Sequence, residues 1–347
     1  MSNFYNANKI LSMKDKDGKD PEIYMICGNR TAGKTFFFKR WIVRRFVKYG
    51  EKFVVLVRTI DDVKDRVLGF WEDVGPIAFP GHEMTQEPMF RGKAGLLKLD
   101  GKPCGYVVPM NKPEFVRNNA AAFADAERIF FDEFMSETGV YLPKEMVKFN
   151  SVRISIGRGG AAGKHTRRVP VYMCSNNVTL FNPYWEAYKI PGMLQNKTKY
   201  LRGKKWVLEQ TFNEEAAAEL EENFGTLSEQ EINYAAHNEY LLDNKKFVDH
   251  VPGIKICACK IRYNGKIYGV WGNDDGSMFL ISTKLQSDTR LTIVTDPSDH
   301  NVDSYLVVKS HPLFKRLKQA YELGHMRFES MACKYAYFEA MCIKEAG

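Results

Sequence analysis

The first half of the chain alternates short, unbroken apolar runs with longer amphipathic stretches. Apolar runs without alternation are typical of strands that are buried on both faces of a parallel sheet. Such runs occur at residues 22–27 (EIYMIC), 52–58 (KFVVLVR), 105–110 (GYVVPM), 128–131 (RIFF) and 169–175 (VPVYMCS). Strands that alternate with helices in this way predict an α/β domain built on a mainly parallel sheet.

The stretch KTFFFKRWIVRRFVKYG, which follows the first of these runs, predicts a helix over residues 34–49. Its spacing places Phe37, Trp41 and Phe46 against the sheet. Lys39 and the arginines of the same stretch are expected to cover the remaining surface. The glycine at position 50 is expected to end the helix.

Beyond about residue 206 the pattern changes to two short helices and then a meander. The capping box SEQE at 228–231 opens the second of these helices. Three β-rich runs follow, joined by Asn-Gly and Asp-Gly pairs that are strong hairpin signals, and two helical patterns close the chain. We therefore expect an α/β domain at 1–205, a helical linker at 206–246 and a smaller α+β domain at 247–347.

Composition predicts a soluble protein with ordinary globular cores. The 347 residues are 44% hydrophobic and 13% aromatic, and no run approaches the roughly 18 to 20 apolar residues that span a bilayer. The seven cysteines are odd in number and scattered, so we expect no disulfide framework. The N-terminal segment lacks the apolar centre of a signal peptide. Together these features predict an intracellular protein with no membrane partner.

The formal net charge of +8 is compatible with a polyanionic partner but does not establish one. Basic residues concentrate in two segments that contain no acid, one from Lys148 to Arg168 and the other from Lys197 to Lys205. Each segment is either a solvated face or a surface that contacts the phosphates of a nucleic acid.

The most specific chemical signal is GNRTAGKT, which fits the pattern glycine-x4-glycine-lysine-threonine with a strand before it and a helix after it. In this motif the glycines let backbone N–H groups converge on the β-phosphate, the lysine reaches the β- and γ-phosphates, and the threonine hydroxyl coordinates Mg²⁺. We therefore expect ATP and Mg²⁺ as cofactors. The expected ATP-binding residues of the loop are Gly28, Asn29, Arg30, Thr31, Ala32, Gly33, Lys34 and Thr35.

Further candidate residues follow the predicted strands. Asp132 and Glu133 come directly after RIFF; Asp132 is expected to hold Mg²⁺ through water, and Glu133 to act as the base that orients the attacking water. The second carboxylate favours an ATPase over a small-molecule kinase. Asn176, after VPVYMCS, is either a γ-phosphate sensor or part of the following turn. Arg158, on a glycine-rich loop, is either an arginine finger for a neighbouring subunit or a solvated side chain.

The chain resembles the DNA-packaging ATPases of phi-29-type tailed bacteriophages, which belong to the ring-forming ASCE branch of P-loop proteins. The matching stretches include FYNANKILS, GNRTAGKT, IFFDEF, CSNNVTLFNPYW and YNGKIYGVWGNDDGSMFLI. The resemblance implies a homomeric ring, pentameric in the family, that uses ATP to drive double-stranded DNA through the portal of an empty procapsid. It implies a location in the host cytoplasm and transiently on the procapsid, and it leaves open whether a structural RNA is a further partner.

The resemblance also implies roles for individual residues. The lysine and threonine of the glycine loop and the acidic pair after RIFF fall on the nucleotide and catalytic positions of the family. Arg158 falls on the family's trans-acting arginine finger. Relatives carry a second trans-acting residue, a lysine, and the nearest basic residue here is Arg117. Arg117 aligns there only with a gap, so whether it takes this second role stays open.

The C-terminal domain of the family looks like an RNase H-type fold that has lost its nuclease centre. In agreement, the run IKICACKIRY contains no acid, whereas a two-metal nuclease needs several carboxylates around its cations. The leading interpretation is ATP-driven translocation of viral DNA. The alternatives are a large terminase with a working nuclease, a helicase, and a slow nucleotide-gated module that binds DNA or the portal.

Overall fold

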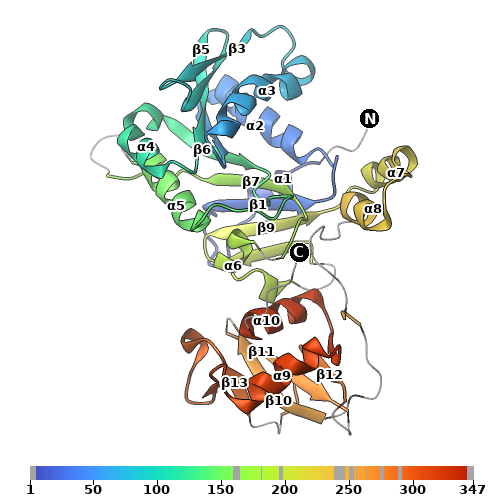
Figure 1. Ribbon diagram of the computed structural model, residues 1–347. Helices are drawn as coiled ribbons and strands as arrows, with labels where there is room; N and C mark the ends of the chain where they lie inside the picture. Colours follow the sequence, from blue (N-terminus) through green and yellow to red (C-terminus); the bar gives the residue numbers. More distant parts are fainter. Residues whose placement is uncertain are drawn as a thin grey trace. The chain divides into compact units, whose positions relative to one another are not determined.

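The structure is a computed structural model, shown in Figure 1. It describes residues 5–158, 165–180, 182–194, 198–237, 247–249, 254, 256–263, 265–273, 277–287 and 291–341. The chain divides into two compact units, Met1–Thr179 with Thr198–Leu241 and Leu180–Lys197 with Leu242–Gly347. Within the described ranges, no helix is long and apolar enough to cross a membrane.

This division differs from the expected domains at 1–205, 206–246 and 247–347. The segment Trp206–Thr211, expected to open the linker, is a strand of the first unit and pairs in parallel with Ile23–Gly28. The two helices expected in the linker also belong to the first unit, whereas residues 180–197 belong to the second. The strand partner of this segment lies more than 180 residues away in the sequence, and a local sequence pattern does not reveal such a partner.

The first unit is built on a nine-stranded sheet in the order β3-β4-β5-β2-β6-β7-β1-β9-β8. The central strands from β5 to β9 run parallel, and β3, β4 and β8 add antiparallel pairs at the two edges. The predicted α/β class with a mainly parallel sheet is therefore confirmed. The strands are β1 (Ile23–Gly28), β2 (Lys52–Val57), β3 (Met84–Met89), β4 (Ala94–Leu99), β5 (Lys102–Pro109), β6 (Ala126–Asp132), β7 (Val171–Asn176), β8 (Tyr200–Gly203) and β9 (Trp206–Thr211).

The first unit also contains helices, and α2 and α8 show how the sequence fixes their ends. A glycine with left-handed φ stands at each end of α2, Gly33 before it and Gly50 after it. The predicted capping box is present at α8, where the side chains of Ser228 and Glu231 each bond to the backbone of the other residue. The helices are α1 (Asn8–Ser12), α2 (Lys34–Tyr49), α3 (Asp61–Ala78), α4 (Pro113–Asn118), η1 (Ala120–Phe123), α5 (Glu145–Ile156), α7 (Glu214–Asn223) and α8 (Glu229–Ala236).

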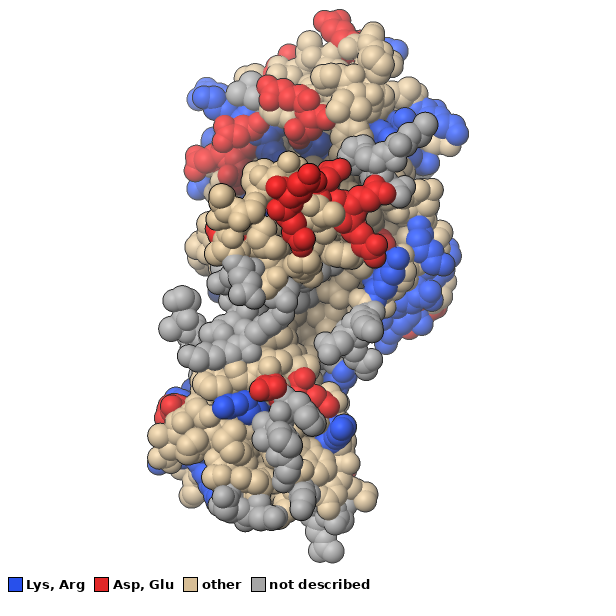
Figure 2. All heavy atoms as spheres, turned by 90° about the vertical axis from the view of Figure 1, so that its right-hand side faces the viewer, with Lys and Arg blue, Asp and Glu red and all other residues tan. Residues whose placement is uncertain are grey.

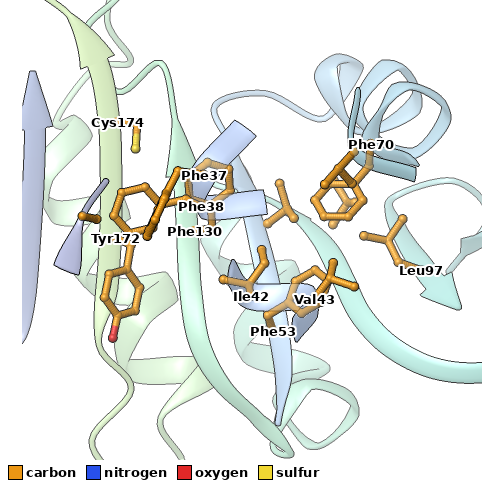
Figure 3. Close-up of a cluster of buried hydrophobic side chains, with 14 of the residues drawn as sticks. Phe37, Phe38, Ile42, Val43, Phe53, Phe70, Leu97, Phe130, Tyr172 and Cys174 are labelled. Atoms are coloured by element: carbon orange, nitrogen blue, oxygen red, sulfur yellow. The ribbon is translucent and has the colours of Figure 1, made fainter. Parts of the chain in front are cut away.

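Aromatic side chains of α2 and the adjacent strands form the centre of the first unit's core (Figure 3). Phe38 of α2 is fully buried and stacks on Phe130 of β6, with 6.1 Å between the ring centroids. Phe37 lies edge-on to Phe38 at 5.4 Å and is buried, as its spacing predicted. Burying rings of this size supplies much of the free energy that holds α2 against the sheet.

The prediction for the other face of α2 was partly wrong. Lys39 does not cover the surface: it is 1% exposed, its ammonium is paired with Asp73 of α3, and it lies 5.4 Å from the centroid of the Phe70 ring. Trp41 and Phe46, expected against the sheet, do pack on this core, although both are only partly buried. A lysine is buried here because a second helix supplies its carboxylate, and the periodicity of α2 alone does not show that partner.

The second unit contains a six-stranded mixed sheet in the order β14-β13-β10-β11-β12-β15. The predicted meander is confirmed as the antiparallel strands β10, β11 and β12. Parallel strands extend it on both sides, and this mixed order agrees with the RNase H-like expectation. Its elements are α6 (Pro183–Ala187), η2 (Pro191–Met193), β10 (Ile256–Tyr263), β11 (Lys266–Gly272), β12 (Phe279–Ser282), β13 (Thr292–Val294), η3 (Pro297–Asp299), β14 (Tyr305–Leu306), α9 (Pro312–Glu322), β15 (Met326–Phe328) and α10 (Met331–Met341). Asn264, Asp275 and Gly276 of the predicted hairpin turns lie outside the described residues.

Candidate nucleotide-binding site

Three strand ends bring the expected motifs together at one edge of the first unit's sheet. β7 lies between β1 and β6, and all three strands run parallel. In this register Gly28 is level with Asn176, and Asp132 is level with Cys174. Ligands of open α/β sheets bind at the carboxyl ends of the strands. The glycine loop and the acidic pair, which are about 100 residues apart in sequence, therefore meet at a position where a ligand is expected.

The glycine loop after β1 needs its glycines for steric reasons. A Cβ at Gly28 would lie 2.4 Å from the carbonyl oxygen of Thr211, because β9 runs directly beside β1. Gly33 has a φ of 90° and Thr31 a φ of 56°, both in the left-handed region. These angles curl the loop immediately before α2, so that the N-terminus of that helix faces the same edge of the sheet.

Lys34 is buried inside the curled loop. Its Nζ donates hydrogen bonds to the carbonyl oxygens of Gly28 at 3.1 Å and Asn29 at 2.6 Å. The same Nζ lies 3.3 Å from Oδ1 of Asn176. Burial lowers the pKa of Lys34 to about 8. The structure thus brings this lysine together with Asn176, at the place where the motif predicts phosphate groups.

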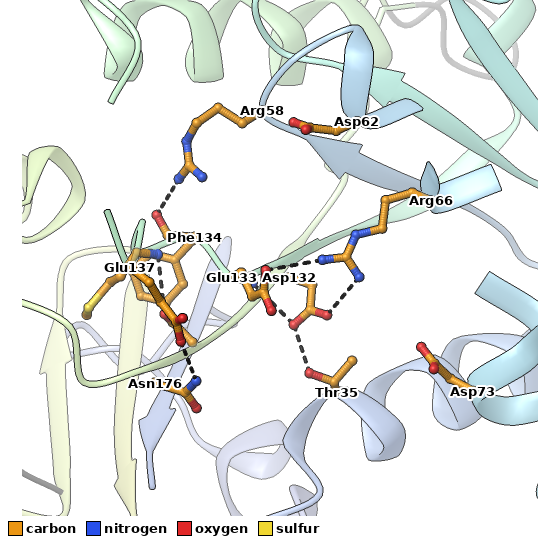
Figure 4. Close-up of polar contacts among 12 residues, drawn as sticks. Thr35, Arg58, Asp62, Arg66, Asp73, Asp132, Glu133, Phe134, Glu137 and Asn176 are labelled. Carbon is orange, nitrogen blue, oxygen red and sulfur yellow. Dashed lines mark hydrogen bonds and ion pairs between the residues drawn. The ribbon is translucent and has the colours of Figure 1, made fainter. Parts of the chain in front are cut away.

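Thr35 and Asp132 also meet in the structure (Figure 4). The Thr35 hydroxyl donates to Oδ1 of Asp132 at 2.8 Å. On its other side, Oδ2 of Asp132 is 3.5 Å from Nη1 of Arg66, which lies on α3. A hydroxyl and a carboxylate are oxygen ligands of the kind that Mg²⁺ prefers, so this pair suits the ion that the sequence predicts.

Glu133 leaves the end of β6 with a φ of 52°, in the left-handed region that is strained for a non-glycine residue. Its side chain is 66% exposed, and Oε2 lies 3.4 Å from Nη2 of Arg66. Desolvation by the surrounding protein and the charge of Asp132 raise the pKa of Glu133 above its usual value. The backbone turn therefore separates two adjacent carboxylates into different environments, with Asp132 on the sheet and Glu133 at the surface of the pocket.

These residues surround a cavity of about 650 Å³, a size within the usual range of small-molecule sites. Gly28 and Asn29 are not among its described lining residues, and their carbonyl groups accept hydrogen bonds from Lys34. The lining residues are Arg30, Thr31, Ala32, Gly33, Lys34, Thr35, Phe36, Asp73, Ile77, Asp132, Glu133, Ser175 and Asn176. The cavity thus gathers the residues for which the sequence predicts phosphate-binding, metal-binding and acid–base roles, and this combination suits a nucleoside triphosphate bound with Mg²⁺.

Two arginines considered for trans-acting roles are not among the described lining residues of this cavity. Arg158 follows α5 and is exposed, and it pairs with Thr166 across the base of a loop. Its side chain has no hydrogen bond or ion pair within the described part of the chain. Arg117 lies in the last turn of α4 and is also exposed. The structure therefore does not bring either arginine into the chain's own pocket.

Comparison with known proteins places this site in a family. The family model for the podovirus DNA encapsidation protein (Gp16) matches residues 1–345. The chain belongs to this family. The resemblance inferred from the motifs is thereby confirmed.

Individual members of the podovirus encapsidation family match over nearly their full lengths. The DNA packaging protein of Bacillus phage phi29 is 25% identical over 354 residues, which cover 97% of this chain and 96% of that protein. The DNA packaging protein of Bacillus phage B103 is 24% identical, with 94% and 99% covered. The bacteriophage Phi-29 viral genome packaging motor assembly aligns with a TM-score of 0.61 at 22% identity, covering 98% of this chain and 100% of that one. The Phi-28 gp11 DNA packaging motor aligns with a TM-score of 0.54 at 14% identity, with both chains fully covered. Both of these structural likenesses concern the fold.

Several residues near the pocket of this encapsidation-family chain could not be identified from the sequence. Arg66 contacts both carboxylates of the acidic pair, but it is one charge among several in an acidic segment. Glu137 bonds to Arg30 of the glycine loop, and Tyr234 bonds to Glu137. Tyr234 lies in a helix that was expected to be linker. No known spacing relates these residues to the glycine loop, so only the fold reveals them.

Several side chains of the two basic segments form ion pairs or hydrogen bonds within the protein. In the first segment, Arg153 pairs with Glu22, Arg167 donates to a backbone carbonyl, and Arg168 lies 3.8 Å from an aspartate. In the second segment, Lys205 also pairs with Glu22, at 2.6 Å. Figure 2 shows lysine and arginine side chains gathered in patches on one face and acidic side chains gathered elsewhere on that face. The side chains of the second segment that remain exposed include Lys199, Arg202 and Lys204.

The pKa of Lys34 predicts weaker nucleotide binding at alkaline pH. A bound polyphosphate favours the charged ammonium and raises its pKa above the value of about 8 in the free protein. Below pH 8 the lysine is already charged, so affinity should be flat; above it, each further pH unit should weaken binding by up to about tenfold. Calorimetric titration of a non-hydrolysable ATP analogue with Mg²⁺ across this range measures the effect. Lys34→Arg should remove the slope, and a flat wild-type profile would contradict the prediction.

Proposed function

We propose that this protein is the ATPase subunit of a motor that translocates double-stranded DNA into a preformed phage capsid. The observation that carries the proposal is the convergence of Lys34, Thr35, Asp132, Glu133 and Asn176 in one pocket, in a chain that belongs to the encapsidation family over 1–345. The motor is a homomeric ring, pentameric by family resemblance, that acts in the host cytoplasm at the portal of the procapsid. A structural RNA is a further candidate partner.

In this proposal the glycine loop binds ATP. Its backbone N–H groups and the N-terminus of α2 face the phosphates, and Lys34 gives up its bonds to loop carbonyls to contact them. Thr35 and Asp132 would hold Mg²⁺, which would neutralise charge on the β- and γ-phosphates. Their mutual hydrogen bond places both oxygens on one side of the pocket before the ion binds.

Glu133 acts as the base that orients the attacking water. Its carboxylate stands at the pocket surface, beyond Asp132, where a water in line with the γ-phosphate can reach it. Arg66 contacts both carboxylates and limits their mutual repulsion. Asn176 senses the γ-phosphate, because its amide group is within reach of Lys34 on one side and of Glu137 on the other.

Arg158 completes the pocket of the neighbouring subunit. It is exposed at the base of a loop and away from its own pocket, and an arginine finger neutralises charge in the transition state of phosphoryl transfer. Arg117 is a further exposed candidate for such a contact. Among the basic residues, Lys199, Arg202 and Lys204 contact DNA phosphates without reading base sequence.

Steady-state ATP hydrolysis with and without linear double-stranded DNA tests the proposal. DNA should stimulate turnover by the wild type, Lys34→Ala should abolish turnover, and Lys93→Ala, at an exposed lysine between β3 and β4, should leave it unchanged. Raising salt from about 50 to 200 mM should weaken DNA binding by tenfold or more, since phosphate contacts release counterions. The proposal would be refuted if DNA did not change the rate of ATP turnover and salt did not change the affinity for DNA.

Analysis of the DNA recovered from the same reactions distinguishes the proposed motor from a large terminase and from a helicase. Cutting of linear DNA in Mg²⁺ or Mn²⁺ would show a terminase-type motor with a working nuclease. Strand separation without a capsid would show a helicase. We expect intact duplex, because β10 carries no carboxylate among its residues Ile256–Tyr263.

A further inference from the structure

Glu137 is the meeting point of three elements around the nucleotide pocket. Its carboxylate accepts hydrogen bonds from Nη2 of Arg30 at 2.5 and 2.6 Å, from the hydroxyl of Tyr234 at 2.6 Å, and from Nδ2 of Asn176 at 3.3 Å. Arg30 belongs to the glycine loop, Asn176 to the end of β7, and Tyr234 to α8. Figure 4 shows the contact between Glu137 and Asn176.

Two of the three donors are residues that a γ-phosphate would contact. Arg30 and Asn176 line the cavity, and Oδ1 of Asn176 already accepts from Lys34. Tyr234 is not among the described lining residues, but its ring lies under the Arg30 guanidinium, 5.4 Å from centroid to Cζ. Partial burial opposes ionisation of Glu137, yet the bonds from Tyr234 and Arg30 hold its pKa below the usual value. The carboxylate is therefore charged at neutral pH, as an acceptor of several donors should be.

Backbone contacts connect the same helical pair to the glycine loop. The N–H of Arg30 donates to the carbonyl of Ala235 at 3.0 Å, next to Tyr234 in α8. Asn29 and Asn213 exchange two hydrogen bonds of 3.0 Å, and the side chain of Asn213 also caps α7. These bonds attach α7 and α8 directly to the glycine loop.

We propose that Glu137 is a positioning residue that couples the γ-phosphate site to the attachment of α8. This inference rests on the proposed ATPase function. Without nucleotide, Glu137 holds Arg30, Asn176 and Tyr234 together. A γ-phosphate carries negative charge into contact with Arg30 and Asn176, repels the Glu137 carboxylate and competes for the same donors. ATP therefore loosens α8 from the loop, and loss of the γ-phosphate restores the attachment, so that hydrolysis is converted into movement of a helix.

Hydrogen–deuterium exchange of the full-length protein tests this coupling. In the wild type, a non-hydrolysable ATP analogue with Mg²⁺ should speed exchange in the peptide 228–237 by about tenfold, the equivalent of one charge-assisted hydrogen bond, whereas ADP should not. Glu137→Gln and, separately, Tyr234→Phe should show the faster exchange without nucleotide and no further response. Glu114→Gln, at an exposed glutamate of α4, should behave as wild type.

Exchange in the peptide 28–36 of the same samples distinguishes failure of the coupling from failure of the ATP site. If the analogue protects this loop but exchange in 228–237 stays unchanged, the coupling is wrong while the ATP site stands. If the loop itself shows no protection, both the ATP site and the coupling fail. A Tyr234→Phe protein that responds to the analogue as wild type does would also overturn the role of Glu137, and this variant keeps every charge of the network. Steady-state kinetics should agree, with Tyr234→Phe changing kcat more than KM because Tyr234 lies outside the pocket lining.

Discussion

Glu133→Gln is expected to reduce ATP turnover by about 100-fold or more while ATP binding is retained. The glutamine keeps the shape of the side chain but cannot accept a proton from the attacking water. Lys34, Thr35 and Asp132 stay in place to bind the nucleotide. Single-turnover hydrolysis and analogue affinity measure the two effects separately. Glu72→Gln, at an exposed glutamate of α3 outside the pocket lining, is the matched control and should retain full activity.

The pH dependence of kcat provides an independent check of this base. Desolvation and Asp132 raise the pKa of Glu133 above 4.5, and the base works only when it is deprotonated. Activity should therefore fall as the pH drops through the raised pKa, at a pH above that of an ordinary glutamate. Nearly wild-type turnover in Glu133→Gln would show that another group orients the water, and the acidic limb of the profile would then belong to that group.

The sequence predicted those parts of the fold that depend on local pattern. Buried strands are recognisable as unbroken apolar runs, and the capping box at Ser228 marks a helix start, because these signals require no distant partner. The glycine loop and the acidic pair were recognisable because phosphate and metal chemistry demands those residue types. Parallel strand order then places them at one edge, which explains why these residues converge in one pocket.

What the sequence could not show depends on long-range pairing. Trp206–Thr211 was expected in the linker but forms β9, which pairs with β1. This pairing also explains the glycine at position 28, because a Cβ there would clash with Thr211. Lys39 could not be predicted as buried before Asp73 was known to face it. Part of the basic charge was likewise assigned to the surface although acidic residues and carbonyl groups within the fold engage it.

Arg158→Ala is expected to lower ATP turnover by about 10³-fold or more, even though the pocket of each variant subunit is intact. The reason is geometric. Arg158 is exposed, has no side-chain partner within the described ranges and is not among the described residues that line its own pocket, so the proposal places its phosphate contact in another subunit. Arg44→Ala, at an exposed arginine of α2, removes the same charge elsewhere and should leave hydrolysis unchanged.

Mixing two inactive variants distinguishes a trans-acting arginine from one that acts in its own pocket. Arg158→Ala subunits keep an intact pocket, and Lys34→Ala subunits keep an intact Arg158. The pocket of an Arg158→Ala subunit should therefore hydrolyse ATP when a Lys34→Ala neighbour supplies Arg158 to it. In a randomly mixed ring with head-to-tail contacts, up to about one quarter of the sites meet this condition, and turnover should recover to that extent. If rings shown to contain both variants stay inactive, Arg158 does not act between subunits. Recovery would show that the exposed arginine and the pocket, separate within one chain, form one active site only across the interface.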